Sequence, residues 1–211
     1  EIFQKAGEKV GLFYPPDPAS LKFSTLGGNV AECAGGPRCV KYGVTKDYIL
    51  GLEVVTPTGD IIRTGGPTTK GVVGYDLTKL MVGSEGTLAV ITKIIIKLLP
   101  KPEAKKTMLV LFDSIDGAAK AVSAIIRGKI IPTTLEFMDS ATIDCVSQAT
   151  DLEVPDTAQA VLIIEVDGDA DMIDKQAGRI ADIVQPLGVV GQASWQAPHP
   201  GHFSASIRGV S

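Results

Sequence analysis

Several features that would mark a class of protein are scarce in this sequence. It has three cysteines without CxxC spacing (Cys33, Cys39 and Cys145) and only two histidines in 211 residues. An odd, scattered set of thiols favours reduced cysteines over a disulfide framework. The histidines, His199 and His202 in the segment HPGHF, have no carboxylate at metal-ligand spacing. We therefore predict neither a disulfide scaffold nor a metal site.

Basic charge and long apolar runs are also lacking. The net charge is −4 and the pI about 5.2, whereas binding to a nucleic-acid backbone needs a basic face. No apolar run approaches the roughly 18 residues that a membrane span needs, and the first residues, EIFQKAGEKVGLF, contain no apolar signal core. We expect a cytoplasmic protein without a nucleic-acid partner or a membrane span.

What remains is the composition of a folded globular protein, 45% hydrophobic and 21% charged. Glycine is unevenly spread, because 15 of the 23 glycines lie at or before Gly86. The segment LPKP at residues 99–102 has two prolines, which lack backbone donors and often mark a linker. We place a domain boundary there, giving domains of residues 1–100 and 101–211.

The first domain contains few regular patterns. Residues 48–55 and 60–64 are β-type runs on either side of a TPTG turn, and residues 88–99 alternate as a third strand. Asp76 is placed to cap a short helix that ends at Met81. The rest of this domain is predicted as glycine-rich loop, which is more loop than a small domain carries without a functional reason.

The second domain alternates regularly between strands and helices. Strands are predicted at residues 107–112, 134–137 and 160–166, with a further one opening at Gly188. Helices are predicted at residues 116–127, 140–148 and 170–184 from apolar positions that recur at helical spacing, with Asp139 as the cap of the second. This pattern indicates a small layered α/β module, which by itself says nothing about function.

The segment STLGGNVAECAGG at residues 24–36 is the richest in possible chemistry. Its two glycine pairs allow close backbone approach and expose successive amides, an arrangement that binds anions such as phosphates. A plain glycine-rich turn is the structural alternative and is favoured for glycine pairs alone. The GxGxxG and GxxxxGK[ST] fingerprints are absent, so a pyrophosphate would have to bind on another scaffold.

Other candidates carry weaker signals. Glu85, between glycines in GSEGTLAVIT, either accepts hydrogen bonds from a ligand or is solvated on a turn. Tyr42 in KYG either lines a flat pocket or packs ordinarily. Cys33 is more readily a buried inert thiol than a reactive one, because no histidine lies near it in sequence. Glu136 and Asp139 are better explained as an edge charge and a helix cap than as a catalytic pair.

Three long motifs stand together in order: PPDPAS–STLGGNVAECAGG, KYGVTKDYILGLEVVTPTGDIIRTGG and GYDLTKLMVGSEGTLAVIT. Over residues 11–190 the sequence resembles the FAD-linked subunits of bacterial glycolate oxidase, which belong with D-lactate and D-2-hydroxyglutarate dehydrogenases in the vanillyl-alcohol oxidase type of flavoprotein. The resemblance implies an α+β fold: the second lobe of a two-lobed FAD-binding domain, followed by part of a ferredoxin-like α/β cap domain over the substrate.

The resemblance also implies an activity and a set of residues along FAD. The parent enzyme would oxidise a small 2-hydroxy acid, glycolate or D-lactate, and pass electrons to an acceptor or to other glycolate oxidase subunits, through which it could associate with a membrane. No residue of this chain is expected to be catalytic. The residues expected along the cofactor are Pro16, Ser20, Thr25, Gly27, Gly28, Asn29, Gly35, Gly36, Tyr42, Gly43, Glu85, Gly86 and Ile91.

Departures from the family pattern qualify these expectations. Nothing corresponds to the family's N-terminal lobe with its PRGxGTGLSGG loop, and the ending SWQAPHPGHFSASIRGVS does not resemble the family. Cys33 stands where asparagine is usual, and Ala89 where glycine is common. We therefore expect a central fragment that binds FAD weakly or not at all.

Two other interpretations stay open. A non-enzymatic remnant could act as a binding or oligomerising module through an exposed apolar lobe interface. A nucleotide-binding protein unrelated to flavin would instead hold phosphate on its glycine loop.

Overall fold

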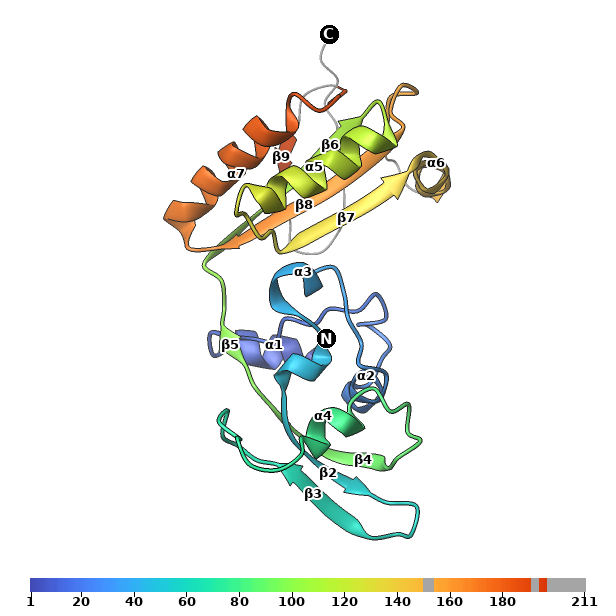
Figure 1. The fold of residues 1–211 in the computed structure, drawn as a ribbon, viewed down its shortest axis with the longest axis vertical. Helices are drawn as coiled ribbons and strands as arrows, with labels where there is room; N and C mark the ends of the chain where they lie inside the picture. Colours follow the sequence, from blue (N-terminus) through green and yellow to red (C-terminus); the bar gives the residue numbers. More distant parts are fainter. Residues whose placement is uncertain (150–153, 191–193, 197–211) are drawn as a thin grey trace. The chain divides into compact units, whose positions relative to one another are not determined.

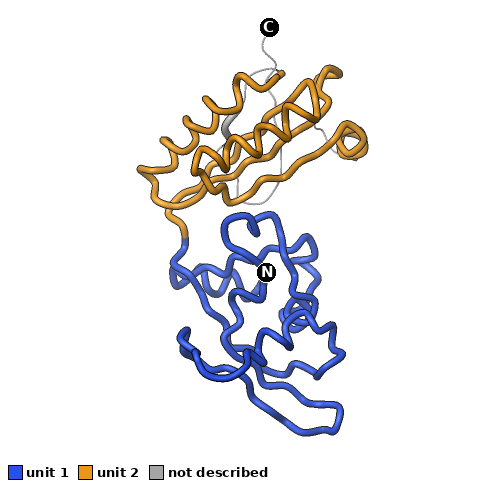
Figure 2. The backbone as a smooth tube through the Cα atoms, in the orientation of Figure 1, with its two compact units in different colours: residues 1–101 blue, residues 102–211 orange. Residues whose placement is uncertain are grey.

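The computed structural model of this chain describes residues 1–149, 154–190 and 194–196. The chain divides into two compact units, residues 1–101 and 102–211 (Figure 2). Each unit has its own sheet and its own buried core, so each is described by itself.

A three-stranded antiparallel sheet with the order β3-β2-β4 organises unit 1 (Figure 1). Its strands are β2 (Ile49–Val55), β3 (Ile61–Gly65) and β4 (Val90–Ile96). Leu52 and Val54 alternate inward on β2 and are buried, as the period of two predicts for a sheet with one covered face. They pack with Val30, Val82 and Ala89 into the core of this unit.

Short helices and one small strand pair complete unit 1. The helices are α1 (Ile2–Glu8), α2 (Leu26–Glu32), α3 (Cys39–Tyr42), the 3-10 helix η1 (Thr45–Tyr48) and α4 (Leu77–Met81). The strands β1 (Leu12–Phe13) and β5 (Leu99–Pro100) pair antiparallel. The predicted cap of α4 is confirmed, because the Asp76 carboxylate accepts a hydrogen bond from the backbone N–H of Lys79 at 2.9 Å.

The prediction of glycine-rich loop is wrong at α1, α2 and α3. For α2 the reason is visible in the structure. Thr25 caps its first turn by accepting a hydrogen bond from the Gly28 backbone N–H at 3.0 Å, Val30 buries its side chain completely, and Cys33 ends it in the left-handed conformation. A cap and one core contact outweigh the low helix propensity of two glycines.

Unit 2 is a four-stranded antiparallel sheet with the order β7-β8-β6-β9 and helices α5 and α7 on one face (Figure 1). Its elements in chain order are β6 (Ala104–Phe112), α5 (Ile115–Arg127), β7 (Thr134–Asp139), α6 (Ser140–Ala149), β8 (Ala160–Gly168), α7 (Ala170–Val184) and β9 (Ser194–Gln196). Apart from α6, this order is the split β-α-β arrangement of ferredoxin-like modules.

Both faces of this sheet carry apolar side chains. Met108, Val110 and Phe112 alternate on β6 toward α5 and α7, and the matching positions of β8 join them in the larger core. Leu111 and Val161 face the other way and pack with Ile143 of α6. Alternate residues of one strand thus serve two separate cores, which explains why β8 reads as a continuous apolar run.

Candidate functional site

All the residues that the resemblance places along FAD lie in unit 1, in several groups on different segments of the chain. The first group is the opening turn of α2, with Thr25, Gly27, Gly28 and Asn29. No atom lies within 4 Å of where a Cβ on Gly27 would stand, so the backbone is open to close approach there. Just before the helix, the buried Oγ of Ser24 has no hydrogen-bond partner within the described part of the chain.

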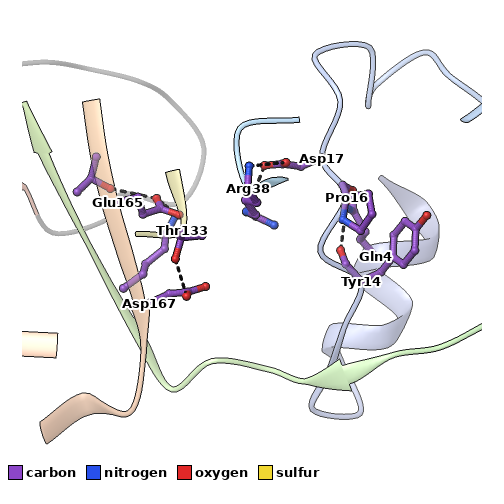
Figure 3. A network of polar contacts seen from close by, with 10 residues as sticks. Gln4, Tyr14, Pro16, Asp17, Arg38, Thr133, Glu165 and Asp167 are labelled. Atoms are coloured by element: carbon purple, nitrogen blue, oxygen red, sulfur yellow. Dashed lines mark hydrogen bonds and ion pairs between the residues drawn. The ribbon is translucent and has the colours of Figure 1, made fainter. Parts of the chain in front are cut away.

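A second group joins the segment that contains Pro16 to the Gly35-Gly36 pair. A Cβ on Gly36 would overlap the Asp17 carboxylate and lie 2.6 Å from the Asp17 carbonyl oxygen, and Gly36 has a φ of +152°. Asp17 is tied to Arg38 by a 3.1 Å contact between its Oδ2 and the arginine Nε (Figure 3). The two chain segments, at Asp17 and at Gly36, can approach so closely only because residue 36 is glycine.

The backbone of this segment is held from the other side as well. The Gln4 side-chain amide donates to the Pro16 carbonyl at 2.8 Å and to the Tyr14 carbonyl at 3.3 Å (Figure 3). Ser20 is exposed, and its carbonyl accepts the backbone N–H of Ser24 at 2.8 Å in a turn that leads to α2. Pro16 and Ser20 therefore lie on a chain segment whose path is fixed by specific hydrogen bonds.

Tyr42 and Gly43 form a third group. The buried Tyr48 hydroxyl donates to the Tyr42 carbonyl at 2.7 Å, and the Tyr42 ring meets the Phe13 ring edge to face with 5.5 Å between centroids. Burial, reinforced by the carboxylate of Asp47, raises the pKa of Tyr48 to about 12. Tyr48 therefore stays a protonated donor at neutral pH.

Glu85 and Gly86 form a fourth group, on a loop late in the sequence of unit 1 that contacts α2. The backbone N–H groups of Gly83 and Glu85 donate to the carbonyls of Val30 and Ala31 at 3.0 and 2.9 Å, so this loop satisfies carbonyls at the C-terminal end of α2. The Glu85 side chain is exposed, and the position of a Cβ on Gly86 is open. Ile91 differs from these residues, because it lies half-buried in β4 opposite Val54 and packs against the core.

The Cys39 thiol is not an activated nucleophile. Burial is the largest effect on Cys39 and raises the pKa of its thiol, while the Cys33 side chain is half-buried at the end of α2. A raised pKa leaves the thiol protonated and poorly reactive at neutral pH.

The residues around α2 fit a dinucleotide cofactor. Phosphate oxygens need exposed backbone donors, and the open turn at Gly27 can provide them. The Ser24 hydroxyl, next to the capping Thr25, adds a buried polar group without a partner among the described residues. Sequence reasoning missed Ser24 and the contact between Asp17 and Arg38. Neither left a recognisable signal, since single polar residues 21 positions apart show no spacing pattern.

Unit 1 also has a cleft of about 670 Å³ that contains none of the residues predicted along FAD. It is formed by parts of β2 and β3, the loop of residues 66–76, and α4. The sequence TGGPTTKGVVG at residues 64–74 could have signalled it, because it combines glycine, threonine and lysine in the manner of an anion-binding loop.

Unit 2 carries a polar cluster at one end of its sheet. Glu165 accepts hydrogen bonds from Lys105 and Thr107, both at 3.1 Å, and Asp167, which is 6% exposed, accepts one from Thr133 at 2.6 Å (Figure 3). Asp139 caps α6 through the Thr142 backbone N–H at 2.8 Å, which confirms that it is a structural cap.

The described residues contain no group of three or more His, Cys, Asp or Glu side chains arranged to hold a metal ion. Of the helices they form, none has the length and apolar character to cross a bilayer. His199 and His202 lie outside the described residues.

Comparison with known families matches both units. Residues 2–65 match the family described as FAD binding domain, and residues 101–198 match the FAD linked oxidases, C-terminal domain. The chain is 55% identical over 179 residues to glycolate oxidase subunit GlcD of Bacillus subtilis, covering 85% of this chain and 38% of that protein. It is 43% identical over 136 residues to a D-lactate dehydrogenase of Anaerostipes hadrus, covering 64% of this chain and 28% of that protein.

Solved structures show the same architecture. An alkyldihydroxyacetonephosphate synthase superposes with a TM-score of 0.73 and 27% identity, covering 95% of this chain and 38% of that one. The VAO-type flavoprotein MtVAO615 of Myceliophthora thermophila superposes with a TM-score of 0.66 and 18% identity, covering 92% of this chain and 33% of that one.

The fold is therefore the mixed helix-and-sheet fold of vanillyl-alcohol oxidase-type flavoproteins. Together with the two family matches and the identity to the glycolate oxidase subunit, it confirms the resemblance to the FAD-linked oxidases that the motifs predicted. The chain spans 38% of the length of the glycolate oxidase subunit that it matches.

Proposed function

We propose that this chain is part of an FAD-dependent oxidoreductase that oxidises a small 2-hydroxy acid, glycolate or D-lactate, to the 2-oxo acid. The observation that carries the proposal is the open glycine turn at the start of α2 in a chain 55% identical to a glycolate oxidase subunit. FAD, when bound, accepts the two electrons that leave the hydroxyl-bearing carbon, because the cofactor carries the redox chemistry in such enzymes.

In this proposal the two units have different tasks. Residues 1–100 are the second lobe of a two-lobed FAD-binding domain, and residues 101–211 are part of the cap domain over the substrate. The separate cores of the two units support a division of this kind.

The residues around α2 hold the cofactor through backbone as much as through side chains. Thr25, Gly27, Gly28 and Asn29 lie along FAD and its pyrophosphate, and Gly35 and Gly36 close that loop beside Pro16 and Ser20. Tyr42, Gly43, Glu85, Gly86 and Ile91 complete the lining. The exposed carboxylate of Glu85 and the open backbone of Gly86 support this placement, whereas the half-buried Ile91 contributes chiefly through packing.

The proposed partners follow from the same resemblance. Electrons pass to an acceptor or to other glycolate oxidase subunits in the cytoplasm, in association with a membrane where those subunits provide it. Exposed apolar side chains such as Phe23, Val73 and Tyr75, each at least 90% exposed, support a surface for self-association or for another chain.

A chimera tests the enzymatic proposal. Residues 11–190 replace the matching segment of the Bacillus subtilis glycolate oxidase subunit, and FAD content and dye-linked oxidation of glycolate and D-lactate are measured. We expect bound FAD and oxidation of at least one of the two acids. A folded chimera that binds FAD and oxidises neither acid contradicts the proposed substrate class.

The 211-residue chain alone is the matched comparison. We expect it to bind FAD weakly or not at all, because losing part of a cofactor's contacts removes several decades of affinity. Absorbance during an FAD titration measures this. A stable yellow complex with shifted flavin bands would contradict that expectation while supporting the choice of cofactor.

A further inference from the structure

We propose that the cleft of unit 1 formed by β3, the loop of residues 66–76 and α4 binds a small organic phosphate ester, at a site separate from the residues assigned to FAD. This inference does not rest on the proposed oxidase activity. It rests on four features of unit 1: backbone N–H groups without acceptors, lysines without carboxylate partners, glycines with open Cβ positions, and the volume of the cleft.

Free backbone donors are the first observation. From residue 68 to residue 76, no backbone N–H donates a hydrogen bond within the described part of the chain. The bonds at its borders are those from the Gly66 N–H to the Leu50 carbonyl at 3.1 Å and from the Leu77 N–H to the Tyr75 carbonyl at 3.0 Å. The loop between them thus offers a row of amide donors beside a cleft, which suits an oxyanion.

Unpaired cations are the second observation. Lys79 and Lys97 line the cleft, and neither side chain has a hydrogen bond or ion pair with a described residue. Arg63 also lines it, with its Nε and one terminal nitrogen bonded to Glu53. The two lysines therefore line the cleft without a carboxylate partner among the described residues, whereas Arg63 is paired with Glu53.

The carboxylates that line the cleft are already engaged. Asp47 accepts the Val44 backbone N–H at 2.9 Å, and Asp76 accepts that of Lys79 at 2.9 Å. Each carboxylate is thereby held by its own backbone, and the charged lining consists of these two carboxylates and three cationic side chains, Arg63, Lys79 and Lys97. That balance favours an anionic ligand over a cation.

The shape of the lining gives the third observation. Positions of a Cβ on Gly66, Gly71 and Gly74 are all open, so a ligand can reach the loop backbone. Thr68 and Thr69 add hydroxyl donors that have no partner among the described residues. Thr64 and Thr78 also line the cleft, and the buried 2.9 Å hydrogen bond from Thr78 to Thr64 joins α4 to β3.

Size and apolar lining select an organic ester over the bare ion. A volume of about 670 Å³ is within the range of small-molecule sites and exceeds what inorganic phosphate fills. Ile49, Leu50 and Val73 line the same cleft and would contact a carbon skeleton. The geometry therefore suits a phosphate group at the lysines and the loop amides, with an organic body beside these side chains.

The test uses the 211-residue chain labelled with ¹⁵N and titrated with glycerol 3-phosphate at constant ionic strength. We expect saturable amide shifts concentrated in residues 66–79. A variant with Lys79→Gln and Lys97→Gln should bind at least about tenfold more weakly, as expected for lost charge-assisted hydrogen bonds. The matched control, Lys9→Gln with Lys175→Gln, removes two exposed lysines outside the cleft and should bind like the parent chain.

Each remaining outcome decides the proposal. Unsaturable shifts, equal weakening in both double variants, or equally tight binding of glycolate would overturn it. Displacement of glycerol 3-phosphate by FAD with shifts in residues 25–29 would show that the site is not separate. Equal melting temperatures of the two variants without ligand would show that weaker binding is not loss of fold. Failure of the oxidase chimera would leave these results unchanged.

Discussion

At the scale of single residues, Gly36 allows its own chain segment to lie close to the segment that contains Asp17. Gly36→Ala would drive a Cβ into Asp17 at a φ of +152°, so we expect a loss of about 1–3 kcal/mol in the free energy of unfolding. Urea denaturation followed by circular dichroism measures it. Unchanged stability would mean that residues 17 and 36 are not held together as described.

Gly27 is the matched contrast to Gly36. Its Cβ position is open and it lies inside α2, so Gly27→Ala should raise stability by about 0.5–1 kcal/mol by lowering the cost of ordering the helix. In the oxidase chimera the same substitution should reduce FAD content, because the new methyl group stands where the cofactor would approach. A more stable chimera with full FAD content would remove Gly27 from the cofactor surface.

Glu53 predicts a dependence of stability on pH. Its pKa is lowered, first by the hydrogen bond from Arg63 and then by that from Lys93. A carboxyl whose pKa falls on folding stabilises the fold above its unfolded pKa and loses that contribution as the pH falls through the folded value. Glu53→Gln should therefore lower the melting temperature at pH 7. The difference should begin to shrink as the pH falls below the unfolded pKa of about 4.3, and it should vanish only below the lowered pKa of the folded state.

Scanning calorimetry from pH 3 to pH 8 checks this expectation. Glu136→Gln is a suitable control, because Glu136 is exposed and its side chain has no hydrogen bond or ion pair with a described residue. A difference between parent and Glu53→Gln that stays constant across the whole range would contradict the role assigned to this carboxylate.

At the scale of elements, one buried hydrogen bond joins α4 to β3. Thr78 donates to Thr64 at 2.9 Å, and both side chains are buried. Thr78→Val should cost about 1–3 kcal/mol, because the Thr64 oxygen is left buried without its donor. The double variant with Thr64→Val should recover much of that loss, since no polar group then remains unpaired. Urea denaturation of the three variants forms the test cycle, and additive losses would contradict the pairing.

The elements that the sequence predicts are those with strong periodicity. The helix predicted at residues 170–184 has those bounds in the structure. The strand predicted at residues 160–166 begins at the predicted residue and ends two residues later, at Gly168. The turn between β2 and β3 and the Asp76 cap are likewise confirmed. Each of these elements buries a continuous apolar stripe or an alternating apolar face. The hydrophobic periodicity that predicts it therefore lies within one contiguous stretch of sequence.

Elements that depend on tertiary contacts were not predicted. The helix α2 has the sequence LGGNVAE, which favours loop, and it is held by the Thr25 cap and the buried Val30. The approach of Asp17 to Gly36 and the cleft beside Thr68 come from contacts between distant residues. The motifs located the candidate cofactor surface only through family resemblance, and its geometry follows from these long-range contacts.

At the scale of the whole molecule, the two units have separate apolar cores. In unit 2, Leu162 and Ile164 are fully buried in the larger core, while Leu52 and Val54 centre the core of unit 1. Every residue assigned to FAD belongs to unit 1. The cofactor-binding and cap roles that we propose therefore fall on units that each have a core of their own and the means to fold cooperatively.

This organisation predicts two unfolding transitions that respond to different substitutions. Ile164→Ala removes a fully buried side chain from unit 2 and should lower the transition of that unit by about 2–5 kcal/mol, because the cavity cannot close completely. Gly36→Ala should lower chiefly the transition of unit 1. Differential scanning calorimetry of the parent and the two variants, with circular dichroism of a chain limited to residues 102–211, assigns each transition. A single transition lowered equally by both substitutions would show that the units unfold as one, and FAD binding would then stabilise the entire chain rather than unit 1.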